Sequence, residues 1–234
     1  MKPEHIAEQQ YLQATYYLDA DHPDIRAYAL QHTREARTDR EKAVNLYYAV
    51  RDEFWYSPYR LDFRPEGLKA SAFLNRTPKA GHCLNKGMLL AATARAVGIP
   101  SRLSFYHVRN HLATERLEQV IGTNLLVFHT AAELWLEDAW VKATPAFNNA
   151  LCKKLGVAPL EFDGRSDSIF QQYDGVGNRF MEYEHDYGAF DDLPFDLMVS
   201  ELKKYYGHIV TEEMLEKHHY VLDLETLANT GGEA

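Results

Sequence analysis

The sequence predicts an α+β fold, with helices in the front third of the chain and antiparallel strands after them. Three observations carry this prediction. Capping signals near residues 21 and 38 each precede a helical pattern. A third helical pattern begins at a cysteine. Residues 102–108 and 124–144 partly alternate apolar with polar positions, which is typical of strands. The 234 residues, 46% of them apolar, suffice for one substantial core, so we expect a single domain over 1–234.

The first two helices are predicted from their starts. Asp21-His22-Pro23 is typical of a helix N-terminus and precedes the apolar positions Ala27 and Leu30. Thr38-x-x-Glu41 is a capping-box signal for a second helix that continues to Phe54. The front third is therefore expected to be helical.

The third helix begins at Cys83. Leu84 and Met88 start its helical spacing, Gly98 fits the left-handed position after a helix, and Pro100 prevents continuation. A thiol in a first helical turn lies near unpaired backbone N–H groups, which favour the thiolate. Because free cysteines are more often small buried hydrophobes, Cys83 alone does not indicate chemistry.

A histidine downstream makes Cys83 more informative. His129 lies within the strand-like segment 124–136, and thiol catalysis needs an imidazole that exchanges a proton with the sulfur. Glu137 and Asp138 follow. If they form a two-residue hairpin turn, His129 and Thr144 share a face of the sheet as diagonal neighbours, whereas a three-residue loop separates them.

A series of motifs follows in a fixed order along the chain. Their residues are Gly81, Cys83, Arg95, Ala96, Gly98, Ile99, Pro100, His129, Glu133, Trp140, Val141 and Pro145. In this order they resemble the transglutaminase-like superfamily of papain-type cysteine enzymes. The resemblance covers about residues 38–148 and includes the upstream helix that ends in 50–56. It implies a transglutaminase-like, papain-like cysteine protease fold, in which a helical N-terminal part packs on an antiparallel sheet. We expect residues 149–234 to be a C-terminal extension that covers the cleft.

The resemblance implies that Cys83 is the nucleophile and His129 the base of a catalytic triad. The third residue of this triad, which orients the imidazole, departs from the family pattern. The family places an aspartate directly before the proline, where this chain has Thr144. A threonine hydroxyl can accept the ring N–H but carries no charge, so lower basicity is expected at His129. Asn148 and Asp163 are alternative acceptors.

A tetrahedral intermediate also needs hydrogen-bond donors for its oxyanion. The backbone N–H of Cys83 is the predicted first donor. Tyr56 and Asn75 are candidates for the second, although loops of unknown shape separate them from Cys83.

The function implied by the resemblance is thiol-dependent acyl transfer or hydrolysis. The chain would be a cysteine peptidase or amidase, or a transglutaminase-like acyltransferase, acting through a thioester on amide bonds of peptides, proteins or glutamine-like side chains. Water or a second amine would resolve the thioester. The alternative hypothesis is a non-catalytic peptide- or protein-binding module on the same fold, which the missing aspartate favours.

Composition excludes other classes. With 34 acidic and 25 basic residues, the net charge is −9 and no basic stretch suits a nucleic acid. Two cysteines, Cys83 and Cys152, provide no disulfide framework, and residues 1–10 lack a secretion signal. No segment is long and apolar enough for a membrane span. We therefore expect a cytoplasmic protein without nucleic-acid or membrane partners; its oligomeric state is not predictable.

A metal site is the chemical alternative. His107-x-x-x-His111 would present two imidazoles on one helical face, with His82 or Cys83 as a further ligand. His107 instead ends a strand-like run, so we expect neither metal nor cofactor.

Beyond Asn148 the pattern weakens. Residues 150–155, 196–206 and 212–219 are predicted helices. The segment 163–194 reads as a long ordered loop, whose aromatic residues either cover the cleft or pack in the core. These aromatic residues are Phe170, Tyr173, Phe180, Tyr183, Tyr187 and Phe190.

Overall fold

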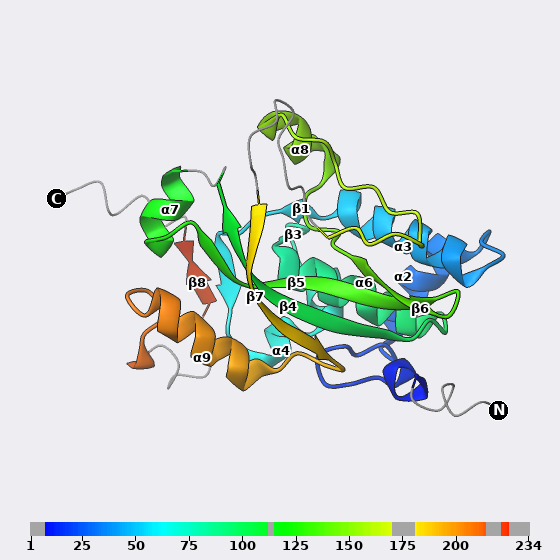
Figure 1. Ribbon diagram of the computed structural model, residues 1–234. Coiled ribbons are helices and arrows are strands. Elements are labelled where there is room, and N and C mark those ends of the chain that lie inside the picture. The colour runs from blue at the N-terminus through cyan, green and yellow to red at the C-terminus, as the bar shows by residue number, and fades with distance from the viewer. Residues whose placement is uncertain (1–7, 112–114, 170–180, 214–220, 225–234) are drawn as a thin grey trace.

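The computed structural model describes residues 8–111, 115–169, 181–213 and 221–224 (Figure 1). Helices and strands follow each other in a mixed order, and the α+β class predicted from the sequence is confirmed. The elements are η1 (Gln9–Leu12), α2 (Pro23–Thr33), α3 (Asp39–Glu53), β1 (Trp55–Tyr56), β2 (Arg60–Asp62), α4 (Pro65–Leu68), α5 (Ala70–Leu74), β3 (Ala80–Gly81), α6 (Cys83–Ala96), β4 (Ser101–Asn110), α7 (Glu115–Ile121), β5 (Leu125–Leu136), β6 (Ala139–Ala143), α8 (Asn149–Leu155), β7 (Met181–Phe190), α9 (Phe195–Tyr206) and β8 (Val221–Asp223).

The largest sheet is antiparallel, with strand order β6-β5-β4-β7. Its hairpin between β5 and β6 turns on two residues, since Leu136 pairs with Ala139. Glu137 and Asp138 have φ values of 49° and 65°, which is the geometry of a type I′ turn. The two-residue hairpin is therefore confirmed. The smaller pairs are β1-β3, which is parallel, and β2-β8, which is antiparallel.

Helix α6 is the centre of the molecule. It packs against β5 and β4, and α2, α3 and α5 contact its other sides (Figure 1). Every residue from Leu84 to Arg95 is buried, so the helix is enclosed on all sides and has no solvent-exposed face along this stretch. At Gly87 a Cβ would lie 3.1 Å from Thr130, and this close approach brings the helix start against β5.

The predicted starts of the N-terminal helices are confirmed. The His22 side chain accepts a hydrogen bond from the Asp24 N–H at the start of α2. Thr38 and Glu41 form the complete capping box of α3. These caps satisfy backbone N–H groups that have no partner inside a helix.

The C-terminal part differs from its prediction. Residues 181–190, predicted as loop, form β7 and pair with β4. Phe170, Tyr173 and Phe180 lie outside the described residues, as does most of the predicted helix 212–219. The predicted helices 150–155 and 196–206 are present as α8 and α9. Among the described helices, none has the length and hydropathy needed to cross a bilayer.

Candidate active site

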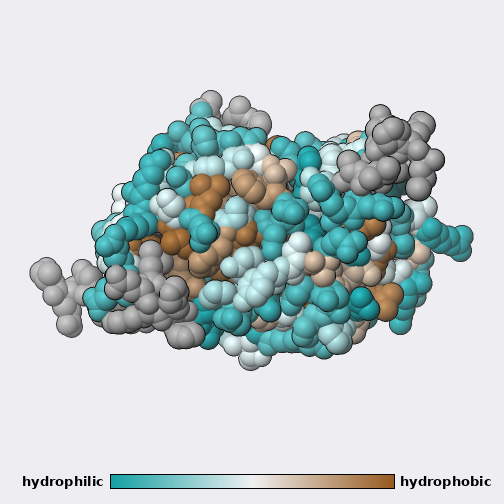
Figure 2. Space-filling model, turned by 90° about the horizontal axis from the view of Figure 1, so that it is seen from below, coloured by the Kyte–Doolittle hydropathy of each residue, from teal (hydrophilic) through white to brown (hydrophobic). Residues whose placement is uncertain are grey.

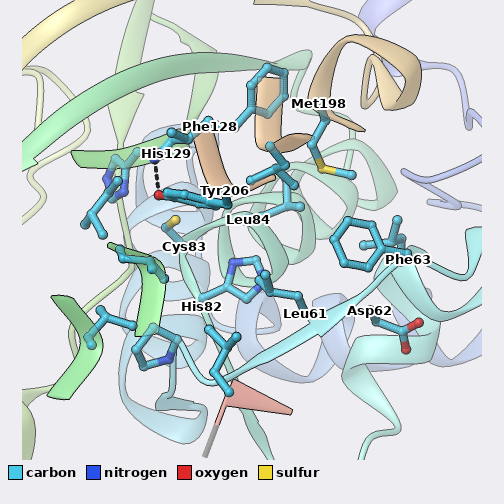
Figure 3. A pocket seen from close by; sticks show the side chains of 18 of the residues that line it. Leu61, Asp62, Phe63, His82, Cys83, Leu84, Phe128, His129, Met198 and Tyr206 are labelled. Atoms are coloured by element: carbon cyan, nitrogen blue, oxygen red, sulfur yellow. Dashed lines mark hydrogen bonds between the residues drawn. The ribbon is translucent and has the colours of Figure 1, made fainter. Parts of the chain in front are cut away.

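Cys83 and His129 line one cavity of about 90 Å³ (Figure 3). They come from different elements, since Cys83 is the first residue of α6 and His129 lies in β5. His82 and Tyr56 also line this cavity. The fold thus brings a thiol and an imidazole 46 positions apart in sequence to the wall of one cavity.

The position of Cys83 at a helix start has two opposing effects on the thiol. Burial raises the pKa of Cys83 to about 11, while the backbone N–H groups of Thr130, Leu84 and Cys83 itself lower it. The expected stabilisation of the thiolate by the helix N-terminus is therefore present, but burial outweighs it. The turn before the helix is held by the His82 N–H, which donates to Asn85 Oδ1 at 3.3 Å.

His129 follows an irregularity in β5. Tyr106 pairs with His129 but Val108 pairs with Leu126, so β5 carries one extra residue here, a β-bulge. Phe128 occupies the left-handed region with φ of 63°, a strained conformation for a residue with a side chain. The bulge sets the direction of the strand immediately before His129.

The imidazole of His129 is buried and neutral. Burial lowers its pKa to about 4, and its residue is only 4% exposed. Neither ring nitrogen has a hydrogen-bond partner among the described residues, so no hydrogen bond joins it to Cys83. Leaving a buried polar atom unpaired costs about 1–3 kcal/mol, and a group entering the cavity could recover this energy.

The structure places the three candidate orienting residues differently. Thr144 follows β6 and is buried, and its hydroxyl has no hydrogen-bond partner among the described residues. Asn148 accepts a hydrogen bond from the Tyr56 N–H at 3.1 Å. Asp163 is exposed, and its carboxylate accepts hydrogen bonds from the N–H groups of its own turn, at 165 and 166. None of the three is hydrogen-bonded to His129.

The two candidates for the second oxyanion donor are also separated. Tyr56 lines the cavity, and its phenol is near enough to Cys83 for the two to interact electrostatically. The Asn75 amide instead donates to the Asp24 carboxylate at 2.7 Å in an exposed position. Tyr56 is therefore the candidate that lies at the site, besides the backbone N–H of Cys83.

Helix α9 closes the cavity, and its part in the site could not be predicted. Met198, Leu202 and Tyr206 of this helix line the cavity. The Tyr206 hydroxyl accepts from the Val127 N–H at 2.9 Å, drawn in Figure 3, and donates to the Leu125 carbonyl at 2.6 Å. The sequence indicated a helix here, but no local signal placed it over Cys83.

A buried lysine, Lys86, connects helix α6 to two neighbouring backbone segments. Lys86 Nζ donates to the carbonyl oxygens of Arg51, Phe54 and Ala146 at 2.7–2.8 Å. These carbonyls belong to the end of α3 and to the segment after β6, so one side chain ties both to the first turns of α6. A lysine in helical spacing usually indicates a solvated face, which is why sequence reasoning missed it.

The histidine pair considered for a metal site is arranged otherwise. His107 lies in β4, a strand, and its ring contacts the Glu201 carboxylate at 3.2 Å and the Tyr187 hydroxyl at 2.8 Å. His111 faces Glu182 at 3.4 Å. Across the described parts of the chain, no three side chains of the usual ligand types gather around one point.

Comparison with known proteins identifies the family. Among solved structures, the chain is similar to a "putative cysteine protease" from Cytophaga hutchinsonii, with 14% identity over 81% of this chain and 55% of that chain and a TM-score of 0.47. A "putative protease" from Parabacteroides distasonis shares 13% identity over 59% of this chain and 25% of that chain, with a TM-score of 0.37. The chain thus spans just over half of the first protein and a quarter of the second.

No curated protein matches the chain. The family model of the transglutaminase-like superfamily matches residues 26–145, which is more than half of the 234 residues and contains Cys83, His129 and Thr144. This chain therefore belongs to the transglutaminase-like superfamily.

Proposed function

We propose that this protein is a thiol-dependent enzyme that transfers or hydrolyses acyl groups at amide bonds, with Cys83 as nucleophile and His129 as base. The observation that carries the proposal is the shared cavity, to which α6 contributes the thiol and β5 the imidazole. Membership in a family of papain-type cysteine enzymes supports the same roles. The expected substrates are peptide or protein amides.

The proposed chemistry begins from two neutral groups. Cys83 Sγ attacks the amide carbonyl carbon while its proton passes to His129, and the backbone N–H of Cys83 donates to the oxyanion. The C–N bond then breaks, and His129 returns the proton to the departing amine. This leaves a thioester on Cys83. Water or a second amine attacks the thioester carbonyl, and the C–S bond breaks to restore the thiol.

The state of His129 suits a base that acts only when substrate is present. Its pKa of about 4 keeps the ring neutral at physiological pH, and both nitrogens are unoccupied by described side chains. The buried hydroxyl of Thr144 is the proposed acceptor for the other ring N–H. Because it carries no charge, the imidazolium formed during attack gains less stabilisation than a carboxylate would give.

The proposal is tested by turnover of peptide amides, with and without an added amine acceptor, by the full chain. Cys83→Ser and His129→Ala are each expected to lower the rate by at least about 100-fold, since a positioned general base contributes on the order of 10²–10⁴. Cys152→Ala is the matched control, because that cysteine is buried outside the cavity. Full activity in either site variant would contradict the assigned roles.

A binding module is the second candidate. The absence of a hydrogen bond between His129 and Cys83, together with the raised thiol pKa, favours it. Calorimetry with the same peptide amides separates the two. Binding without turnover, unchanged in Cys83→Ser, would support the module and exclude the enzyme.

A further inference from the structure

The cavity continues away from the sulfur into an apolar region. Cys83, His129 and Tyr206 lie at one end, and Phe63 and Met198 at the other, with Leu84 between them (Figure 3). At the far end, Phe63 comes from the loop after β2 and Met198 from α9. Other apolar residues of the cavity wall are Leu61, Leu68, Leu202 and Leu224.

The far end carries one charged side chain, Asp62, and that charge is already paired. The Arg64 guanidinium donates to both Asp62 carboxylate oxygens at 2.6 and 2.9 Å, and the Arg64 N–H donates at 3.0 Å. These contacts hold the pKa of Asp62 below its usual range despite burial. A cationic ligand group would have to displace Arg64, and an anionic one would lie next to the Asp62 carboxylate, so the far end does not suit a charged ligand.

The cavity also limits the size of its occupant. Its volume of about 90 Å³, which covers both ends, is smaller than the ~150 Å³ cavity that holds benzene in an engineered protein. The far end therefore suits a small aliphatic side chain better than an aromatic ring.

On the face seen from below, apolar side chains gather in the half of the molecule that holds α9 (Figure 2).

We propose that the apolar end of this cavity binds an aliphatic side chain of about leucine size, carried by the residue whose carbonyl Cys83 attacks. This inference rests on the proposed function and names its substrate class, which is peptide amides with an aliphatic acyl residue. A glutamine side-chain amide fits poorly. Its own backbone N–H and C=O would follow the acyl carbonyl into the apolar end, where they find no hydrogen-bond partners.

The experiment uses matched acetyl-aminoacyl chloromethyl ketones, in which the thiol sulfur displaces chloride and the side chain alone varies. The rate of Cys83 alkylation is followed by mass spectrometry of the intact chain in the Cys152→Ala background. The leucyl reagent is expected to react on the order of 10- to 100-fold faster than the glycyl reagent, the gain from burying such a side chain. The lysyl and aspartyl reagents should be no faster than the glycyl one.

The outcomes separate this inference from the proposed function. Equal rates for all four reagents, or the fastest rate for a charged one, overturn the inference while leaving amide turnover untouched. Leucine-selective alkylation with no turnover of any peptide amide supports the pocket and removes the enzyme proposal instead.

A variant tests the location of the pocket. Met198→Ala enlarges its far end and should raise the phenylalanyl-to-leucyl rate ratio by about 10-fold. Ser200→Ala, on the exposed side of the same helix, should leave the ratio unchanged. Thermal unfolding of both variants checks that they are folded. An unchanged ratio in folded Met198→Ala would place the side-chain pocket elsewhere.

Discussion

At the scale of residues, burial keeps both the Cys83 thiol and the His129 imidazole uncharged near neutral pH. The pKa of the thiol is about 11 and that of the imidazole about 4, both moved away from neutrality by burial. A thiolate–imidazolium pair would need the reverse order of pKa values. The position of Cys83 at the start of α6 is therefore not sufficient to make it a thiolate. Burial raises the thiol pKa by more than the backbone N–H groups lower it.

The thiol pKa gives a direct prediction. Iodoacetamide reacts with the thiolate, so the labelling rate of Cys83 should rise with pH through an apparent pKa well above the ~8.5 of a free cysteine. His129→Ala should leave this profile nearly unchanged, since the neutral ring makes no hydrogen bond to the sulfur. Rates are measured from pH 6 to 11 in the Cys152→Ala background. An apparent pKa below 8.5 that rises in His129→Ala would instead indicate an ion pair.

At the scale of elements, the β5 bulge and α9 stabilise each other. The Phe128 N–H donates to His107 Nδ1 at 3.4 Å, and His107 Nε2 contacts Glu201 of α9 at 3.2 Å. Tyr206 of the same helix binds the backbone on the other side of the bulge. These contacts offset the strained φ of Phe128, and they hold the helix over the thiol.

Tyr206→Phe tests this arrangement. The substitution leaves the Val127 N–H and Leu125 carbonyl without their side-chain partner, so it should lower the free energy of unfolding by about 1–3 kcal/mol. It should also speed iodoacetamide labelling of Cys83, because α9 is held less firmly over the cavity. Tyr205→Phe, which removes a partly exposed hydroxyl from the next position, is the control. Equal unfolding free energies and labelling rates in both variants would show that the Tyr206 hydroxyl does not hold the helix.

Elements with local signals were predictable from the sequence, and those set by tertiary contacts were not. The capping box at Thr38 and the turn at Glu137-Asp138 depend on neighbouring residues, so the pattern contains them. The bulge at Phe128 contains no glycine or asparagine, the residues that usually indicate a left-handed backbone conformation in a sequence. It is stabilised instead by contacts from His107 and Tyr206. Strand β7 is rich in Asp, Glu and aromatic residues, and it forms because its backbone pairs with the free edge of β4.

The same reasoning applies to the site. The motif spacing placed Cys83 and His129 as candidates, but no sequence pattern predicts that three backbone carbonyls converge on Lys86. The sequence pattern also does not predict that α9, more than 100 residues after Cys83, lines the cavity. These features arise from segments that meet only in the folded chain.

At the scale of the whole molecule, the site influences stability because it keeps an imidazole neutral in the interior. His129 has a folded-state pKa of about 4, against 6.5 for an ordinary histidine. Below pH 6.5 the unfolded chain therefore takes up a proton that the folded chain does not. The free energy of unfolding should fall from pH 6.5 to about pH 4, and for His129 alone the loss amounts to about 3 kcal/mol.

His129→Gln isolates this contribution. The variant lacks the titrating ring, so its unfolding free energy relative to wild type should rise by about 3 kcal/mol between pH 7 and pH 4. Urea unfolding at several pH values measures the difference, and His111→Gln, at a partly exposed histidine, controls for surface effects. A constant difference across this pH range would mean that His129 becomes protonated in the folded protein. The ring would then have to gain water or a charged partner as the pH falls, and the apolar cavity wall would not be what keeps this base neutral.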